Sequence, residues 1–205
     1  MAQAPIFAGL WGPLASLLLA SLVVMGSPGP STMSLTAVGA AFGWRRALPY
    51  CAGLVLGTTA VLVAVAAGVA SALSAIPGLA PALVVGSGLY VLYLAVRIAT
   101  APPLSGNPEA AQAPSLAGGF LLAAANAKAW LAIGAVYSGT SLPLAPGPEA
   151  ALKTLALAVM IVAIHAAWLV AGASLSRALS EPVLSRRVNL AFAAILVVTT
   201  VLALL

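Results

Sequence analysis

Charged side chains are almost absent from this chain of 205 residues. Aspartate, glutamate, lysine and arginine make up 5% of it, against 63% hydrophobic residues, and the mean hydropathy is +1.16. A soluble domain carries about a quarter charged residues, whereas several stretches here run for roughly 20 residues without one. The composition therefore excludes a water-soluble globular protein and predicts an integral protein of a lipid bilayer.

Cysteine and histidine each occur once, as Cys51 and His165. A lone cysteine excludes an internal disulfide and the paired thiols of a membrane carrier of reducing power, so we expect Cys51 to be a small buried residue. A lone histidine excludes the common His/Cys metal clusters, and we expect no metal and no other cofactor. No cluster of carboxylates or activated nucleophile is present, so we expect no enzyme activity.

Long hydrophobic runs, separated by charges and by proline and glycine clusters, are what the chain does contain. About 20 apolar residues cross a bilayer as a helix, and on this basis we predict six spans at 14–42, 47–73, 81–99, 117–142, 151–176 and 188–205. The polar stretch 100–115 is a predicted linker between halves 1–99 and 116–205. Because each half has three spans, the halves face opposite ways, as in the inverted repeats of many transporters. The predicted fold is one all-α membrane domain.

Basic residues outnumber acidic ones by eight to three. They are scattered over short loops and not gathered on one face, so we expect no nucleic-acid partner. Six of them are arginines in or beside the first, third and fifth predicted loops: Arg45, Arg46, Arg97, Arg177, Arg186 and Arg187. The positive-inside rule then predicts that these loops are cytoplasmic and that both termini lie outside.

The sequence Ser27-Pro28-Gly29-Pro30 interrupts the first hydrophobic run. Two prolines around a glycine cannot stay helical, so the helix should break there. Lipid cannot hydrogen-bond the freed backbone, which persists only where it is buried in protein or lines a cavity. We therefore take Pro28, Gly29, Pro30 and Ser31 as candidate substrate-binding residues.

Lys128 lies near the middle of the fourth predicted span, roughly 15 to 20 Å from either end of the helix. A lysine there costs about 2.5 to 3.5 kcal/mol on insertion scales, so it should face a cavity, a partner or a substrate. An internal ion pair is the alternative, but no predicted span contains an acidic residue. Asn126 either binds substrate with it or forms an interhelical hydrogen bond.

His165 in the fifth predicted span is the other titratable side chain deep in the membrane. With Lys128 it is a candidate for proton coupling. The alternative is a neutral imidazole bonded to a backbone carbonyl. Gly39 and Gly43, and likewise Gly53 and Gly57, are spaced four apart, which predicts close helix packing and also allows a homo-oligomer.

Several motifs, taken together in their order and spacing, resemble the lysine exporter (LysE/RhtB) family of bacterial amino-acid exporters, including its homoserine and threonine resistance type. They are Ser27-Pro28-Gly29-Pro30, the four glycines above, Gly88-Leu89-Tyr90-x-x-Tyr93-Leu94, Gly119-Phe120-Leu121 and Asn126-Ala127-Lys128-Ala129. The resemblance covers nearly the whole chain. It implies a six-span inner-membrane exporter of amino acids or related small metabolites, driven by the proton gradient.

The same resemblance places the family's Asn-Pro-Lys motif on Asn126 and Lys128, with Ala127 where the family usually has proline. Without that proline we expect the fourth span to bend less.

We predict that the two breaks meet near the bilayer centre and form one site. The helix restarting at Ser31 and the Lys128 ammonium would bind a carboxylate, and carbonyls just before Pro28 would accept the substrate ammonium. This arrangement favours a neutral amino acid over a cationic one. A metal or cation exporter and a non-transporting structural membrane subunit remain the alternatives.

Overall fold

The computed structural model describes residues 6–68, 78–100, 113–178 and 182–204, and the regular structure in this part of the chain is entirely helical. The helices are α1 (Ile6–Val24), α2 (Pro30–Ala66), α4 (Leu79–Ala99), α5 (Leu116–Ala125), α6 (Ala127–Ser138), α7 (Pro146–Ala178) and α8 (Pro182–Leu204). Most of the predicted linker at 100–115 lies outside the described residues, as does the predicted end of the second span after residue 68.

The predicted break in the first hydrophobic run is confirmed. Helix α1 ends at Val24 and α2 begins at Pro30, a first helical position at which the missing N–H of proline costs nothing. Gly29 precedes it in extended conformation, and its N–H donates to Oγ1 of Thr32 at 2.9 Å. The threonine thus satisfies one of the backbone donors that the helix start leaves without an intrahelical partner.

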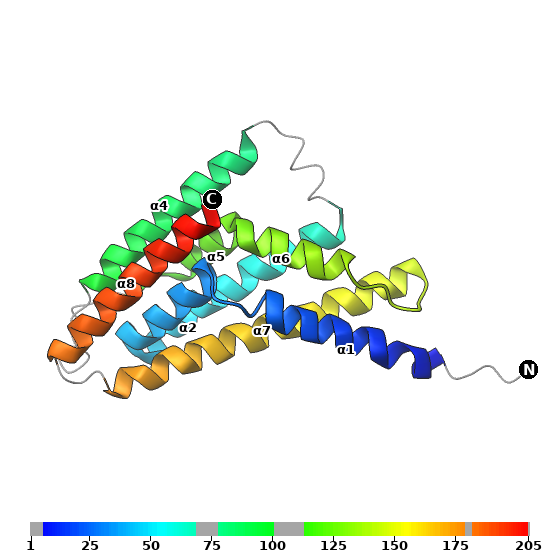
Figure 1. Cartoon of the computed structure of the whole chain (residues 1–205), viewed down its shortest axis with the longest axis horizontal. Helices are drawn as coiled ribbons and strands as arrows, with labels where there is room; N and C mark the ends of the chain where they lie inside the picture. Colours follow the sequence, from blue (N-terminus) through cyan, green and yellow to red (C-terminus); the bar gives the residue numbers. More distant parts are fainter. Residues whose placement is uncertain (1–5, 69–77, 101–112, 179–181, 205) are drawn as a thin grey trace, which may run out of the picture.

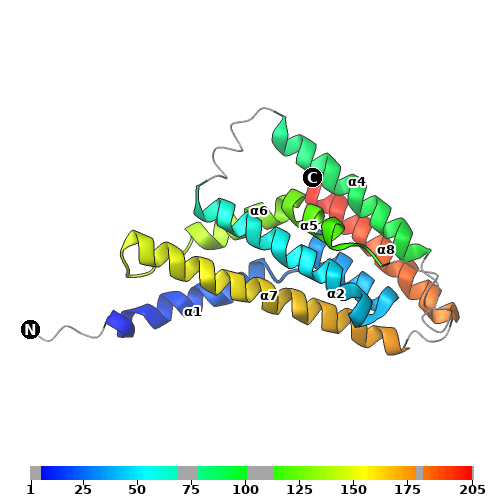
Figure 2. The ribbon, with the colours of Figure 1, turned by 180° about the vertical axis from the view of Figure 1, so that it is seen from behind.

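Gly43 divides α2 into two segments. Its φ of 73° and ψ of 164° are non-helical, and a positive φ is a conformation that glycine adopts without the steric cost of a Cβ. The segments before and after it lie side by side and run in opposite directions (Figures 1 and 2). The prediction that Gly43 serves helix packing is wrong, because a Cβ there would meet nothing within 4 Å; the residue makes the turn between the first and second hydrophobic runs.

A second break separates α5 from α6 at Asn126, with a bend of 61°. The span thus bends sharply although Ala127 stands where the family usually has proline. Asn126 leaves the helical conformation, with φ of −75° and ψ of 104°, and its Oδ1 accepts from the Lys128 N–H at 3.1 Å. The Trp130 indole donates to the Ala124 carbonyl at 2.8 Å. These two side chains satisfy backbone groups that the bend frees, so the bend does not need a proline.

The two broken segments cross the molecule next to each other. Helix α2 packs on α5 and α7, α1 packs on α6 and α7, and α4 packs on α8. Figures 1 and 2 show α1 and the first part of α2 running along the long axis in one direction, and α5 and α6 running in the other. The two breaks consequently lie together near the centre of the molecule.

Glycines allow the closest of these helix contacts, as the spacing predicts. A Cβ on Gly53 would overlap the Leu116 carbonyl of α5, and one on Gly57 would come within 2.5 Å of the Phe120 carbonyl oxygen. Gly39 lies in the same way against Leu169 of α7, where a Cβ would be 3.1 Å from the carbonyl oxygen. The absence of side chains lets the backbones approach, and dispersion contacts then hold the helices together.

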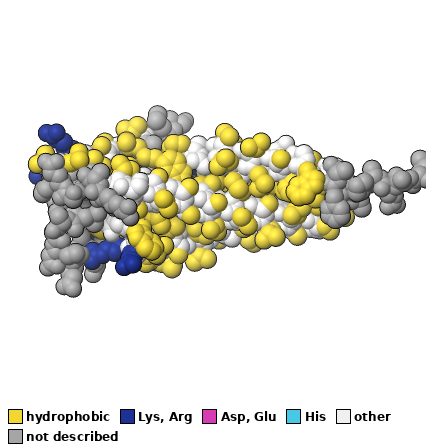
Figure 3. Space-filling model, turned by 90° about the horizontal axis from the view of Figure 1, so that it is seen from below, with side chains coloured by type: hydrophobic (Ala, Val, Ile, Leu, Met, Phe, Trp, Pro, Cys, Tyr) yellow, Lys and Arg dark blue, Asp and Glu magenta, His cyan; other side chains and the backbone are white. Residues whose placement is uncertain are grey.

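The surface suits a membrane. By length and composition two described helices could cross one, Pro146–Leu175 and α2 (Pro30–Ala66), of which the segment after Gly43 is the longer, and a third span results if α5 and α6 are counted together. The six predicted spans and their inverted repeat remain predictions beyond this. Figure 3 shows hydrophobic side chains along the flank and lysine and arginine side chains at one end. Arg45, Arg97 and Arg186 stand beside the Gly43 turn, in the last turn of α4 and in the first turns of α8.

We expect Gly53→Ala to lower the free energy of unfolding by about 1–3 kcal/mol, because the methyl group has to displace the α5 backbone. Gly134→Ala in α6 is the matched control, since a Cβ there meets nothing within 4 Å. Thermal unfolding in detergent, followed by tryptophan fluorescence, measures both. Equal effects of the two variants would contradict the close α2–α5 contact.

Candidate functional site

Lys128 joins the two breaks. Its Nζ donates hydrogen bonds to the carbonyl of Ser27 at 2.6 Å and to that of Pro28 at 2.8 Å, across about a hundred residues of sequence. Both carbonyls belong to the non-helical segment after α1, and among the described residues no backbone N–H donates to either of them. The expectation that a lysine at this depth faces a partner or a cavity is confirmed.

Gly29 leaves the space through which this lysine passes. A Cβ at Gly29 would lie 2.6 Å from Cδ of Lys128 and 2.8 Å from Nζ. The φ of Gly29 is −172°, an extended conformation open to any residue. A Cβ at this position would therefore displace the end of the Lys128 side chain, and the sequence could not show this because Lys128 is remote in the chain.

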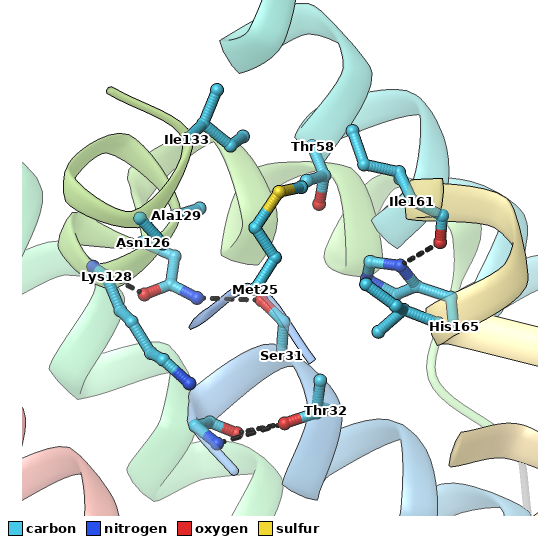
Figure 4. Close-up of a pocket in the computed structure, with 13 residues that line it drawn as sticks. Met25, Ser31, Thr32, Thr58, Asn126, Lys128, Ala129, Ile133, Ile161 and His165 are labelled. Carbon is cyan, nitrogen blue, oxygen red and sulfur yellow. Dashed lines mark hydrogen bonds between the residues drawn. The ribbon is translucent and has the colours of Figure 1, made fainter. Parts of the chain in front are cut away.

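Asn126 makes a second link between the breaks. Its Nδ2 donates to Oγ of Ser31 at 2.8 Å, while its Oδ1 caps α6 (Figure 4). Both side chains are buried. The interhelical hydrogen bond that the sequence left as one of two alternatives is therefore present.

Trp168 of α7 contributes a third link to the first break. Its indole Nε1 donates to the carbonyl of Gly26 at 3.1 Å. Together with Lys128, it hydrogen-bonds three carbonyls in the segment between α1 and α2. The segment is thus held by α6 on one side and α7 on the other, as irregular backbone inside a membrane protein requires.

A cavity of about 40 Å³ lies beside the breaks. It has room for a few water molecules and too little for a whole amino acid, so a larger solute has to widen it. The residues that line it come from both breaks, α2, α6 and α7: Met25, Gly29, Ser31, Thr32, Thr58, Asn126, Lys128, Ala129, Ala132, Ile133, Ile161, Ile164 and His165.

The cavity has a cationic side. An ammonium group has three donors; two of those on Lys128 bind carbonyls, and the described residues provide no partner for the third. Helices α2 and α6 begin at Pro30 and Ala127, next to each other, as the hydrogen bond between Asn126 and Ser31 shows. Each helix N-terminus adds partial positive charge. An anionic group would be stabilised there.

In Figure 4, His165 lies on the side of the view opposite Lys128. Its Nδ1 is 2.8 Å from the carbonyl of Ile161, one turn earlier in α7. A carbonyl only accepts, so Nδ1 carries the proton and Nε2 presents a lone pair. The expected alternative of a carbonyl-bonded imidazole is thus present, but it uses only one of the two ring nitrogens.

Lys153 is a second buried lysine, and it differs from Lys128 in that all sides of its ammonium group have a partner. Its Nζ donates to the Thr140 carbonyl at 2.7 Å, pairs with Oε1 of Glu149 at 3.4 Å and lies 4.5 Å from the Tyr137 ring centroid. These contacts tie the start of α7 to the end of α6. Among the described residues this is the one ion pair recorded, and Lys128 does not share in it.

The structure brings most of the predicted site residues together. Gly29, Ser31, Asn126, Lys128 and His165 line one cavity, while Pro28 and Pro30 adjoin it in the chain. One prediction is wrong: the carbonyls at Ser27 and Pro28 are not free for a substrate ammonium, because Lys128 binds them.

The polar lining residues that the sequence analysis did not name as candidates are Thr32 and Thr58. Thr58 stands beside Thr59 in an apolar helix. This pair of hydroxyl side chains is the feature of the sequence that could have indicated a polar lining residue there. The sequence could not show that Thr58 faces the cavity, because α2 is apolar on all sides.

Comparison with known proteins gives one match. The model of the LysE type translocator family matches residues 22–205. No curated protein and no solved structure matches the chain.

We expect Ser31→Ala and Asn126→Ala to have non-additive effects on stability. The coupling energy should be about 0.5–1.5 kcal/mol, since each variant alone removes the same interhelical hydrogen bond. A double-mutant cycle of unfolding free energies in detergent measures it. Additive effects would show that the bond contributes nothing and that Asn126 acts only as the cap of α6.

Proposed function

The chain belongs to the LysE type translocator family, and on this premise we propose that it exports neutral amino acids or related small metabolites across the bacterial inner membrane. The family is one of multi-pass membrane transporters for small molecules, not of enzymes. The finer assignment, to neutral amino acids as substrates, comes from the chemistry of the cavity.

The open third donor of Lys128 is the observation that carries this proposal. Lys128 lines the cavity at the point where two helices begin, and a charge-assisted hydrogen bond to a carboxylate would complete its coordination. We assign Pro28, Gly29, Pro30, Ser31, Asn126 and Lys128 as the residues that form this carboxylate end of the substrate site. Gly29 and the prolines act through the backbone, and Asn126 holds α6 in place.

The cavity disfavours a strongly cationic substrate. Its lining residues include Lys128 and no carboxylate, so the side chain of a lysine or arginine substrate would bring a second unpaired cation into a low-dielectric site. The same argument disfavours a metal cation, which would want several carboxylates or imidazoles. A neutral amino acid adds no net charge.

The architecture supports alternating access. The two broken segments run in opposite directions and touch at their breaks, as in an inverted repeat of two three-helix halves with the substrate between them. We propose this arrangement for the chain. The arginines at one end of the molecule then mark the cytoplasmic side, which places both termini outside.

Export needs an energy source, and we propose exchange for protons. Lys128 and His165 are the two cavity residues that can exchange a proton. His165 has the simpler chemistry, since its bare Nε2 can accept a proton without breaking a bond in the structure.

Lys128→Met should reduce export to background while the protein still folds, because the carboxylate loses its charged partner. The measurement is efflux of labelled glycine, L-alanine, L-serine, L-threonine and L-leucine from vesicles containing the purified protein. Lys153→Met is the matched control, since it removes a buried lysine that does not line the cavity. Rates are compared per folded protein. Normal export by Lys128→Met would overturn the role of Lys128 as the carboxylate partner, whereas no export by the wild type would leave the structural-subunit alternative standing.

An inward proton gradient should accelerate export by the wild-type protein. His165→Gln should still export down a substrate gradient, because the amide oxygen replaces the acceptor, but it should no longer respond to the proton gradient. Efflux with and without an imposed pH difference tests this. An unchanged response in His165→Gln would exclude His165 and leave Lys128 as the proton carrier.

A further inference from the structure

Two buried polar atoms beside the cavity take part in none of the hydrogen bonds described above. Among the described residues, Nε2 of His165 and Oγ1 of Thr58 have no hydrogen-bond partner, although the two residues are only 5% and 6% exposed. Both residues line the cavity. Buried polar groups are almost always hydrogen-bonded in folded proteins, so each such exception calls for an explanation.

The Thr58 hydroxyl departs from the usual behaviour of a helical threonine. Such a hydroxyl normally donates to the carbonyl three or four residues earlier, as Thr36 of the same helix does to Thr32 at 2.9 Å. Thr58 makes no such bond. Its hydroxyl is therefore available to a group in the cavity (Figure 4).

The His165 ring has a fixed role at this site. Because Nδ1 donates to Ile161, the lone pair of Nε2 is the atom available to the cavity. A lone pair accepts a hydrogen bond, so this atom suits a donor such as an ammonium group. The carbonyls at Ser27 and Pro28, which could have done the same, are taken by Lys128.

We infer that Nε2 of His165 and Oγ1 of Thr58 form the subsite that receives the ammonium group of the substrate, opposite the carboxylate partner Lys128. This subsite rests on the proposed exporter function and deepens it. A zwitterion then lies with its carboxylate toward α6 and its ammonium toward α7 and the second part of α2. Its side chain meets Met25, Ile133, Ile161 and Ile164, which favours a small apolar side chain.

His165 is the only histidine in the chain, so one labelled residue reports on this subsite. In protein labelled with ¹⁵N at the imidazole, in mildly alkaline buffer where the ring is neutral, we expect the spectrum of a ring protonated at Nδ1. Adding the amino acid that wild-type vesicles export fastest should shift the Nε2 resonance. The same acid without its amino group, such as propionate for alanine, should leave it unchanged.

Transport provides the second readout. Thr58→Val removes the hydroxyl with little change of volume, and we expect a roughly tenfold rise in KM for the exported amino acid, as for loss of one hydrogen bond to a charged group. Thr59→Val is the matched control, since Thr59 neighbours Thr58 but does not line the cavity. His165→Phe should raise KM more than His165→Gln, which keeps an acceptor.

The outcomes separate the two proposals. Export by the wild type with an Nε2 resonance that no amino acid moves, and an unchanged KM in Thr58→Val, would overturn the subsite and leave the exporter standing; the two atoms would then bind only water. If wild-type vesicles export none of the five amino acids, the assignment to neutral amino acids fails, and the subsite fails with it.

Discussion

Backbone groups that leave a helix inside a membrane have to find their partners within the protein, and this constraint organises the centre of the molecule. The segment between α1 and α2 has its carbonyls bound by Lys128 and Trp168. The bend between α5 and α6 is held by Asn126 and Trp130. Lys128 and Trp168 come from helices in the second half of the chain, so the first break depends on that half for its stability.

In the proposed function, Lys128 serves structure and substrate binding with the same ammonium group. Two of its donors hold the first break, and the described residues provide no partner for the third beside the cavity. Lys153, which is more deeply buried, has an anion, a carbonyl and an aromatic ring around it and ties two helices together. The difference between the two lysines is the open donor. A substrate carboxylate that binds it would also act on the contact between the two halves, which couples binding to their relative movement.

The two sides of the cavity favour different chemical groups. Lys128 and two helix N-termini favour an anion on one side, while the lone pair of His165 favours a donor on the other. Apolar residues such as Ile133 and Ile161 also line the cavity. In the proposed function, this separation selects a zwitterion without any buried carboxylate. Because the volume of the cavity is too small for a whole amino acid, binding one would require the helices to move, and the irregular segments at the breaks are where such movement costs the fewest helical hydrogen bonds.

The sequence by itself determined the features that follow from local chemistry. Composition determined the membrane class, because so few charges leave no soluble alternative. The prolines at 28 and 30 determined the first break, because a proline removes a donor and fixes φ wherever it occurs. A lysine in a long apolar run marked the site for the same reason, since its burial cost depends on the run and not on its partners.

Only the tertiary structure decided which groups meet. Lys128 binds carbonyls about a hundred residues away, Gly29 leaves the space that this lysine occupies, and Asn126 bends a helix that lacks the expected proline. Gly43 turns the chain where its spacing suggested packing, and Thr58 faces the cavity where Thr59 does not. In a membrane protein the helices are apolar on all sides, so hydrophobic periodicity does not show which face turns inward. That choice belongs to the packing of one helix against another.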